Sequence, residues 1–422
     1  AVRWGAAKHW RREKHMSSFW KKVVIGLSVL IFAYVAVGYV KGKTGDDKSY
    51  VSLSVYSEVL QRIQDNYVDQ PDIHKVTSGA LHGLLDSLDP QSSYLSPLEY
   101  TDYKQKVDDK SKGGIGVFIS KRFGYVVAVS VLPDSPAQKA GLHDGDLFDS
   151  IAGFSTTEMS IGQAQVLLTG EPGQTVKVDV IRRGTQEPFS VTMTYAKLQS
   201  PRVLQEEMQS DIAYIRIPAF EAGTTKQIRE KLVEFQRQGA KKLILDLRDC
   251  ASGPVNEGID AAQLFLTSGT IGTLRGQTVA TQTFSADASK AVWKGPMTVL
   301  ISNGTAGPAE ILAAAVADNH RGDTVGETTF GTASQQKIIT LDDGAALILT
   351  VANYFTPNGK SIPKEGVEPT VQVNPQAVND VAQLNQDQLA PPAPGQLPSE
   401  NDPVVKRAIE ILQAPAAAPK AA

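Results

Sequence analysis

The sequence contains very little cysteine and almost no net charge. Its single cysteine, Cys250, excludes an internal disulfide framework and any cysteine-rich metal site. The 42 Lys and Arg residues nearly balance the 45 Asp and Glu residues, and the net charge of -3 gives no general attraction to nucleic-acid phosphates. The chain also lacks an HExxH motif and a cluster of carboxylates. We therefore expect no metal, no other cofactor and no nucleic-acid partner.

Long apolar runs are also rare, which excludes a protein with many membrane spans. A length of 422 residues is too great for one hydrophobic core and predicts two or three domains. The content of 21% charged and 41% hydrophobic residues is that of ordinary globular proteins rather than disordered or fibrous ones.

One apolar run does occur, at residues 23–40, and it carries no charge. At ~1.5 Å per residue it is about 27 Å long, just enough to cross the core of a bilayer. The preceding segment, 1–22, is rich in Lys and Arg, so the positive-inside rule predicts that it stays in the cytosol. We expect a single-pass protein of a bacterial inner membrane, with its later domains in the periplasm or outside the cell. A cleaved signal peptide is the less favoured alternative, because no clear A-x-A site follows Tyr39.

The middle of the chain changes its pattern twice. Residues 49–110 show apolar positions at helical spacing, and 111–198 read as short strands separated by Gly and Pro turns, with a helix at 160–168. Residues 199–378 alternate strands and helices, and the strands 337–341 and 346–355 end this region. Such alternation predicts a mostly parallel α/β sheet.

The last segment, 379–422, is rich in Pro, Ala and Gln, with the run APPAPGQLP at 390–398. This composition is typical of an extended linker. Asp402 and Pro403 are start signals for a short amphipathic helix that reaches Leu412. We expect the residues after this helix to be disordered.

Several motifs in a fixed order resemble the carboxyl-terminal processing (tail-specific) serine proteases of bacteria and chloroplasts. The motifs are SLDPQSSYLSP, GGIGVFI, SPAQKAGLHDGD, LILDLR, AEILAAAVADN, TVGETTFG and YFTPNGKSI. The resemblance covers about 50–375 and implies an anchored or exported protein with a PDZ domain before an α/β protease core.

The β-rich region 111–198 corresponds to that PDZ domain. A PDZ domain adds a peptide as an extra strand and holds its terminal carboxylate with backbone N–H groups of a Gly-rich loop. The residues Gly114, Ile115, Gly116 and Val117 match this loop, which implies that protein or peptide C-termini are the partners. A simple bulge in a strand is the alternative interpretation of the glycines.

The catalytic positions depart from the family pattern. The family uses a Ser nucleophile and a Lys general base. Its nucleophile loop, G-S/T-A-S-A-S-E, reads GTAGPAE at 304–310, so Gly307 stands at the nucleophile position. Its lysine loop, T-F-G-K-G-x-x-Q, reads TFGTASQQ at 329–336, so Thr332 stands at the lysine position. Only Gln336, which matches the residue that orients the lysine, is retained.

The loop that stabilises the oxyanion has also changed. The family pattern L-D-L-R-N-N-P-G-G reads LDLRDCASG at 245–253, with Ala251 for Pro and Ser252 for the first Gly. We assign the oxyanion positions to Gly253, which is retained, and to Pro308. Loss of a Pro and a Gly relaxes a turn that must hold an N–H group in one direction.

Other side chains near these loops are candidate replacements for the lost groups. Thr305 precedes the lost nucleophile by two residues and is the candidate substitute. Ser302 and Ser334 are other hydroxyl-bearing residues of these loops. We expect Cys250 to be a small buried thiol rather than a nucleophile. The candidate bases are badly placed, since Lys337 lies at an odd offset from Thr332 and His320 lies about three helical turns from Gly307.

Three functions remain open at this point. The first is a pseudoprotease that binds protein C-termini without cleaving them, alone or with an active paralogous protease. The alternatives are a serine-type endopeptidase with relocated catalytic residues and a purely structural envelope protein. The glycine at Gly307 disfavours the endopeptidase, and the PDZ loop at 113–117 disfavours the structural protein.

Overall fold

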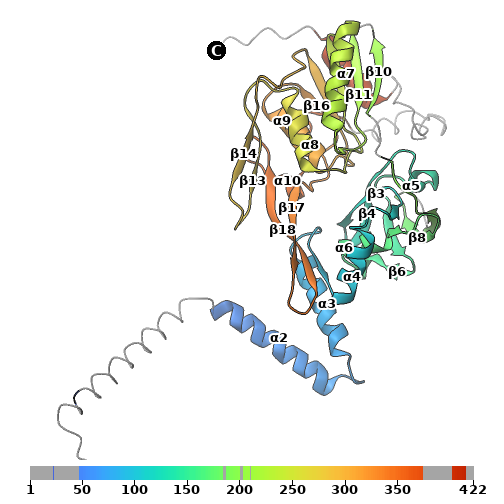
Figure 1. The fold of residues 1–422 in the computed structure, drawn as a ribbon, viewed down its shortest axis with the longest axis vertical. Coiled ribbons are helices and arrows are strands. Elements are labelled where there is room, and N and C mark those ends of the chain that lie inside the picture. Colours follow the sequence, from blue (N-terminus) through green and yellow to red (C-terminus); the bar gives the residue numbers. More distant parts are fainter. Residues whose placement is uncertain are drawn as a thin grey trace, which may run out of the picture. The chain divides into compact units, whose positions relative to one another are not determined.

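The computed structural model describes residues 22, 47–183, 187–199, 203–209, 211–373 and 402–414, and its ribbon is drawn in Figure 1. The chain divides into two compact units, Ala1–Thr77 and Ser78–Ala422. The predicted membrane span at 23–40 lies outside the described residues. Among the helices that are described, none is long and apolar enough to cross a bilayer.

The region 49–110 is helical, as the sequence predicts, apart from one short strand. The first unit contains α2 (Asp47–Asn66) and the first residues of α3 (Ile73–Asp86). The other helices are α4 (Pro97–Lys106), α5 (Pro136–Lys139), α6 (Ile161–Leu167), α7 (Thr224–Gln238), α8 (Val255–Gln263), α9 (Pro308–Asp318), α10 (Ile362–Glu365) and α11 (Pro403–Gln413), with a 3-10 turn at Thr156–Glu158.

The β-rich region forms a module with its own core. Its main sheet has the order β3-β4-β5-β8-β9, with β6 paired to β5, and a separate pair joins β2 to β7. The strands are β2 (Gly113–Gly114), β3 (Val117–Arg122), β4 (Tyr125–Val131), β5 (Leu147–Ile151), β6 (Phe154–Ser155), β7 (Thr169–Gly170), β8 (Thr175–Ile181) and β9 (Phe189–Thr194). The segment 113–120 divides into two strands at Gly116, whose φ of 81° is incompatible with an extended strand.

A second sheet has the order β10-β11-β12-β15-β16-β19. Its strands are β10 (Leu204–Gln209), β11 (Ile212–Arg216), β12 (Lys242–Asp246), β15 (Met297–Ile301), β16 (Asp323–Gly326) and β19 (Val371–Gln372). Only β10 runs antiparallel to its neighbour, and every other pair is parallel. The mostly parallel sheet is therefore confirmed.

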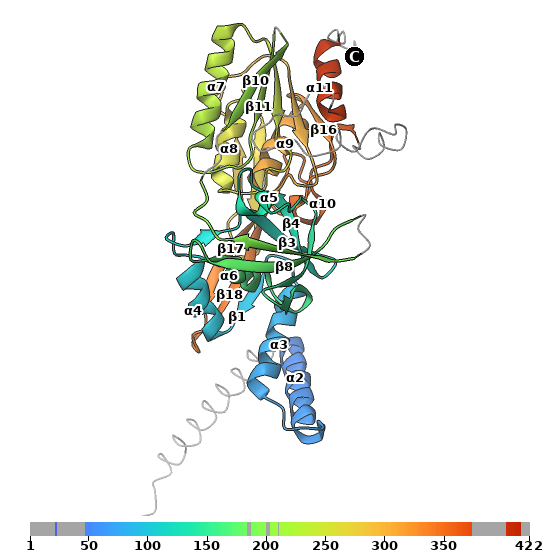
Figure 2. The ribbon, with the colours of Figure 1, turned by 90° about the vertical axis from the view of Figure 1, so that its right-hand side faces the viewer.

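The two faces of this sheet are covered by different helices. Alternate residues of β11 point to opposite sides, as in any strand. Ala213 and Ile215 join the apolar cluster of α7, α8 and α9, whereas Ile212 and Tyr214 join the cluster of α11. In Figure 2, α7 and α11 lie on opposite sides of the sheet strands. The core thus has three layers, and α11 completes one of them.

An ion-pair network joins α11 to the core. Asp402 caps the helix by accepting hydrogen bonds from its first backbone N–H groups, and Arg248 donates to it at 2.6 Å. The same guanidinium pairs at 2.7 Å with Asp246, which is fully buried at the end of β12. Burial alone would raise the pKa of Asp246, but Arg248 lowers it below its ordinary value. The buried Asp246 therefore remains charged, and the helix predicted in the C-terminal segment is an integral part of the core.

The third sheet was not anticipated. It has the order β1-β18-β13-β14, and β17 pairs with β18. Its strands are β1 (Ser93–Leu95), β13 (Thr270–Arg275), β14 (Gln282–Ser285), β17 (Ser334–Thr340) and β18 (Ala346–Phe355). The strands 337–341 and 346–355 were expected in the parallel sheet, which is wrong. They form an antiparallel hairpin because Gly344, with a φ of 86°, allows the tight turn between them.

The carboxylate of Glu99 ties α4 to neighbouring elements. It accepts a hydrogen bond from Ser96 N at 2.7 Å and one from Gln163 of α6, and it lies 3.5 Å from His82 of α3. Burial alone would raise the pKa of Glu99, but the bonds from His82, Ser96 and Gln163 lower it to about 2. Since the folded state holds this carboxyl ionised, its contribution to stability is present above the ordinary pKa and disappears as the pH falls toward 2.

We expect Glu99→Gln to lower the free energy of unfolding by about 2 kcal/mol at neutral pH, after allowance for its partial exposure. The deficit should shrink between about pH 5 and about pH 2, because the native carboxyl is protonated over that range. Urea unfolding of both proteins at several pH values would measure it. The exposed Glu230→Gln is the control, and a deficit that does not change with pH would contradict the assignment.

Candidate functional site

Gly307 lies where β15 leads into α9 and is the last residue before the helix begins. Its φ of 56° and ψ of -116° belong to a backbone region in which side chains are strained. A Cβ built there would meet only the carbonyl oxygen of Ala251, at 3.6 Å. The nucleophile position thus has room for a side chain, and the glycine avoids the strain that a side chain would cause.

The nucleophile and lysine positions are brought together by Glu310, in the first turn of α9. Glu310 is fully buried, and its Oε2 accepts hydrogen bonds of 2.9 Å from both Gly307 N and Thr332 N. Its Oε1 accepts from Thr329 Oγ1 at 2.6 Å and from Gly331 N at 2.7 Å. One carboxylate therefore holds the two predicted catalytic loops side by side.

Burial raises the pKa of Glu310, whereas the hydroxyl of Thr329 and the three backbone N–H groups act in the opposite direction. The three backbone N–H groups can only donate, and the Thr329 hydroxyl, whose oxygen accepts from Val367 N at 2.7 Å, donates its proton to Glu310. We take the ionised form as the bound one. A carboxylate committed to four donors has no free oxygen with which to accept a proton from a reacting hydroxyl group.

The lysine position offers no base. Thr332 has a hydroxyl whose oxygen is buried and has no hydrogen-bond partner among the described residues. A threonine hydroxyl cannot accept a proton at neutral pH. Gln336 is exposed, and its amide donates to Ser334 Oγ at 2.8 Å. No contact joins Gln336 to Thr332 or Gly307 among the hydrogen bonds of the described residues.

The oxyanion loop keeps one of its two predicted positions. Gly253 has a φ of 115°, and a Cβ there would lie 1.6 Å from the carbonyl oxygen of Phe220, so only glycine fits. Pro308 is the residue after the nucleophile position, and proline has no N–H group to donate. The assignment of Pro308 as an oxyanion donor is therefore wrong for a chemical reason.

Thr305 is not placed to replace the lost serine. It is fully buried, its hydroxyl donates to Leu247 O at 2.8 Å, and it accepts from Ser302 N at 2.9 Å. These bonds join the loop after β12 to the loop after β15, and the acceptor for the hydroxyl proton is a backbone carbonyl. The suggestion of Thr305 as a substitute nucleophile is not supported by this geometry.

The remaining candidates are also engaged or remote. Ser302 Oγ donates to Asp249 Oδ1 at 2.9 Å, and Ser334 Oγ donates to Thr332 O at 3.1 Å. Cys250 is fully buried, and burial raises the pKa of its thiol, so the thiolate is disfavoured. His320 lies beyond the far end of α9 from Gly307. Although Ser302 donates to a carboxylate, its oxygen also accepts from Asp249 N and Gly304 N at 3.1 Å, so its lone pairs are already engaged within the loops.

The predicted peptide-binding loop, residues 113–117, leads from β2 through Gly116, whose φ is 81°, into β3. Gly114 N donates to Ala196 O at 3.0 Å, which fixes the base of the loop. The N–H groups of Ile115 and Gly116 have no acceptor among the backbone and side-chain hydrogen bonds of the described residues. The side chain of Ile115 belongs to the core of the module, and Val117 packs against that core. Two free N–H groups at one glycine-rich turn are the donors that a terminal carboxylate needs.

The β-rich module packs directly on the loops around Gly307. Val127 and Val129 of β4 form one buried apolar cluster with Ala251 and Ala306. The hydroxyl of Ser130, also in β4, donates to the carbonyl oxygen of Asp249. The two predicted sites, peptide-binding loop and catalytic loops, therefore belong to parts of the second unit that are in contact.

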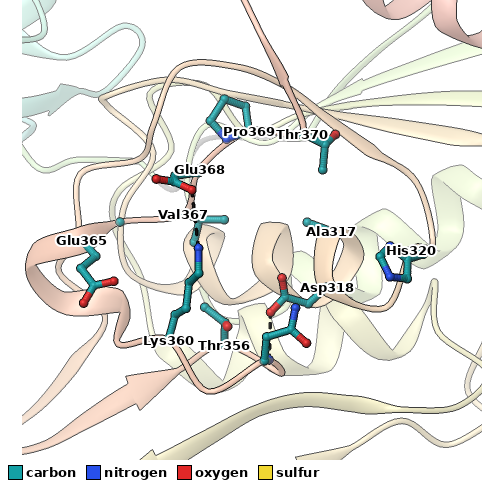
Figure 3. A pocket seen from close by; sticks show the side chains of 12 residues that line it. Ala317, Asp318, His320, Thr356, Lys360, Glu365, Val367, Glu368, Pro369 and Thr370 are labelled. Atoms are coloured by element: carbon teal, nitrogen blue, oxygen red, sulfur yellow. Dashed lines mark hydrogen bonds and ion pairs between the residues drawn. The ribbon is translucent and has the colours of Figure 1, made fainter.

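A cavity of about 290 Å³ lies at the C-terminal end of α9, away from Gly307 (Figure 3). Its lining includes Asp318, His320 and the ion pair of Lys360 with Glu368, whose charged atoms are 3.5 Å apart. In Figure 3 the Lys360 amine points toward the Glu368 carboxylate. The described residues also contain no group of His, Cys, Asp or Glu that could hold a metal ion.

Sequence reasoning missed the role of Glu310. The signal was present, because Pro308 and Glu310 stand at the first and third positions of α9, where proline and an acidic side chain favour a helix start. What the sequence could not show is that the same carboxylate also binds the loop at 329–332.

Comparisons with known proteins agree with this architecture. Residues 211–373 match the model of "Peptidase family S41", and residues 127–182 match that of the "PDZ domain". The chain is 30% identical over 338 residues to "Carboxy-terminal processing protease CtpA" of Bacillus subtilis, covering 80% of this chain and 71% of that protein. It is 31% identical over 330 residues to a "Carboxyl-terminal-processing protease" of Synechocystis sp., with coverage of 76% and 77%.

A solved structure is also similar. The "photosystem II D1 C-terminal processing protease" matches with a TM-score of 0.65 and 27% identity, over 76% of this chain and 92% of that one. The arrangement of a PDZ module and an α/β core is therefore common to both chains.

Proposed function

The chain belongs to the family of carboxyl-terminal processing proteases, which are S41 peptidases with a PDZ domain, and on this premise we propose that it binds protein C-termini without cleaving them. The carboxylate of the bound protein would be held by the free N–H groups of Ile115 and Gly116. The partner is a protein with an accessible C-terminus, and an active paralogous protease is a further candidate partner.

The observation that carries this proposal is the glycine at Gly307. Family members attack a peptide bond with a serine at this position, and a glycine has no atom that can attack. The absence of a base at Thr332 and of an N–H group at Pro308 removes the other two requirements of the reaction. The burial of Thr305 disfavours an endopeptidase with a relocated nucleophile.

The decisive experiment measures cleavage and labelling by the purified full-length protein. We expect no reaction with a fluorophosphonate and no cleavage of an unstructured protein that has an apolar C-terminal tail. Cleavage that is lost on Thr305→Ala would identify a replacement nucleophile and overturn the proposal.

Peptide binding is tested at Gly114, because its backbone tolerates a side chain. A Cβ at Gly114 would meet only Leu198, at 3.4 Å, whereas one at Gly116 would lie 2.3 Å from the Cβ of Ser135 and distort the loop. We expect Gly114→Glu to weaken binding of C-terminal peptides at least tenfold, since its carboxylate repels that of the peptide. The neutral Gly114→Gln should weaken binding far less in a fluorescence titration. Equal losses in both variants would show that the loop does not read the terminal charge.

We also propose a single membrane span at residues 23–40, with the later domains on the periplasmic side of a bacterial inner membrane. The uncharged run and the basic segment before it support this topology. Extraction of membranes with alkaline carbonate should leave the full-length protein in the membrane fraction, and its release into the supernatant would contradict the proposal.

A further inference from the structure

Strand β17 forms a free edge of the third sheet. Among the described residues it pairs only with β18, which it meets along its whole length. Four consecutive side chains, from Gln335 to Ile338, are exposed, and so is Thr340. Nothing in the described part of the chain therefore covers this strand. A free edge presents a row of unpaired backbone donors and acceptors.

The register shows which backbone groups face outward. Leu341 N donates to Ala345 O at 2.8 Å, so this pair, next to the paired Thr340 and Ala346, is a hydrogen-bonded pair. Such pairs alternate along an antiparallel ladder. Ile339 and Lys337 therefore bond to β18, whereas the backbone N–H and C=O groups of Gln336, Ile338 and Thr340 point away from it.

An independent contact supports this alternation. Thr350 of β18 is the partner of Gln336 in the ladder. Its N–H donates at 3.1 Å to Ser92 Oγ, on the side opposite to β17. The backbone groups of Gln336 and Thr350 are therefore not bonded to each other, although the Gln336 side-chain amide donates to the Thr350 hydroxyl at 3.4 Å. The backbone N–H of Gln336 points to the outer edge.

The free edge begins beside the predicted catalytic loops and follows the strand that α6 of the PDZ module contacts. It starts at Ser334, two residues after the lysine position at Thr332. It is also one strand away from the PDZ helix α6, because Gly162 of α6 approaches Ile348 of β18, and Ile348 is paired with Ile338 of β17. Neighbouring strands are about 4.8 Å apart.

We propose that the outer edge of β17 binds an extended segment of the partner protein as an additional strand, upstream of the C-terminus that the PDZ loop holds. This inference rests on the proposed function and extends it from the last few residues of the partner to a longer stretch. The ligand is an unfolded polypeptide segment, recognised by backbone hydrogen bonds at Gln336, Ile338 and Thr340, with little dependence on side-chain sequence.

The edge has features that limit other occupants. A bulge between Gln335 and Gln336 interrupts the regular ladder, and Lys337 places a charge beside the edge. Both features disfavour pairing with a second copy of β17, which would bring two lysines together. They do not hinder a single flexible peptide, which can follow the remaining regular stretch from Gln336 to Thr340.

The experiment uses the full-length protein and two peptides that end in the same apolar residue, one of six residues and one of twenty. We expect the longer peptide to bind at least tenfold more tightly. A twenty-residue peptide that is N-methylated at alternate upstream residues should bind like the short one, because it cannot complete the ladder. Hydrogen exchange should show that the long peptide protects the amides of Ile338 and Thr340.

Two substitutions at one position separate the backbone from the side chain. Ile338→Pro removes the outward N–H group and is tolerated on an edge that faces solvent, so it should reduce binding of the long peptide to that of the short one. Ile338→Ala keeps the N–H group and should weaken binding less than threefold. If the proline variant unfolds, the N-methylated peptide and the hydrogen-exchange measurement on the native protein still test whether the edge of β17 binds the long peptide.

Equal affinity for the long, short and methylated peptides, or no protection of β17 at saturating long peptide, would overturn the inference while leaving PDZ binding intact. Protection of β17 by the long peptide with no binding of the short one would instead refute the proposed role of the PDZ loop and keep the edge. Protection that depends on protein concentration without peptide would show that a second copy occupies the edge and would overturn the proposal.

Discussion

A variant that carries Gly307→Ser and Thr332→Lys should react with a fluorophosphonate at least a hundredfold more slowly than the same variant with Pro308→Ala added. The first two substitutions supply a nucleophile and a base, and the Cβ of a serine fits at Gly307 because its nearest neighbour, Ala251 O, is 3.6 Å away. The third supplies the N–H group that proline lacks. Removal of one oxyanion donor costs roughly 10²–10³ in rate, which sets the size of the difference.

The measurement is the rate of labelling of the purified double and triple variants under identical conditions. Pro308→Ala alone is the control for changes in folding, and it should remain unlabelled because it has no nucleophile. Equal labelling of the two variants, or none in either, would contradict the assignment of Pro308 as the missing donor.

Replacement of Glu310 by glutamine should lower the free energy of unfolding by about 3 kcal/mol. The glutamine side chain has the same size, but its NH₂ group can only donate, and it would face the N–H groups that the carboxylate now accepts. Each donor left without an acceptor in a buried place costs about 1–3 kcal/mol. The loss should therefore be larger than that of an ordinary surface change.

Denaturant unfolding of the purified protein measures this effect. Glu230→Gln, on the exposed face of α7, is the matched control and should change stability by no more than about 0.5 kcal/mol. If the two variants were equally stable, Glu310 would not be the link that holds the loops of Gly307 and Thr332 together.

The sequence predicts the parts of this protein that depend on local pattern. The helix at 160–168 and the alternation of strands and helices in 199–378 follow from the sequence pattern. The resemblance places Gly307 and Thr332 in loops that the structure joins through one carboxylate. The pairing of strands that are distant in the sequence is harder to predict. The sequence analysis assigns the strand at 337–341 to the parallel sheet, and the structure places it in the antiparallel one. No local feature of a strand indicates which of two sheets it joins.

The candidate site shows the same division. The sequence itself shows that the serine and the lysine are replaced. The burial of Thr305 cannot be predicted in this way, because its hydroxyl bonds to Leu247, which is distant in the sequence, as well as to the nearby Ser302. The sequence alone also shows that Pro308 cannot donate to an oxyanion, because proline has no backbone N–H group.

The contact of Arg248 with Asp402 has a consequence for how the end of the chain behaves. β19 ends the described part of the core sheet, and α11 belongs to the same chain and contacts the core again at Asp402. The helix is therefore covalently tethered to the face that it covers. Release of α11 is therefore an intramolecular event, and its return does not depend on protein concentration. Effective concentrations for tethered segments are on the order of millimolar. A separate peptide with the sequence of α11 would need a similar concentration to compete for the face formed by Ile212, Tyr214 and Ile244.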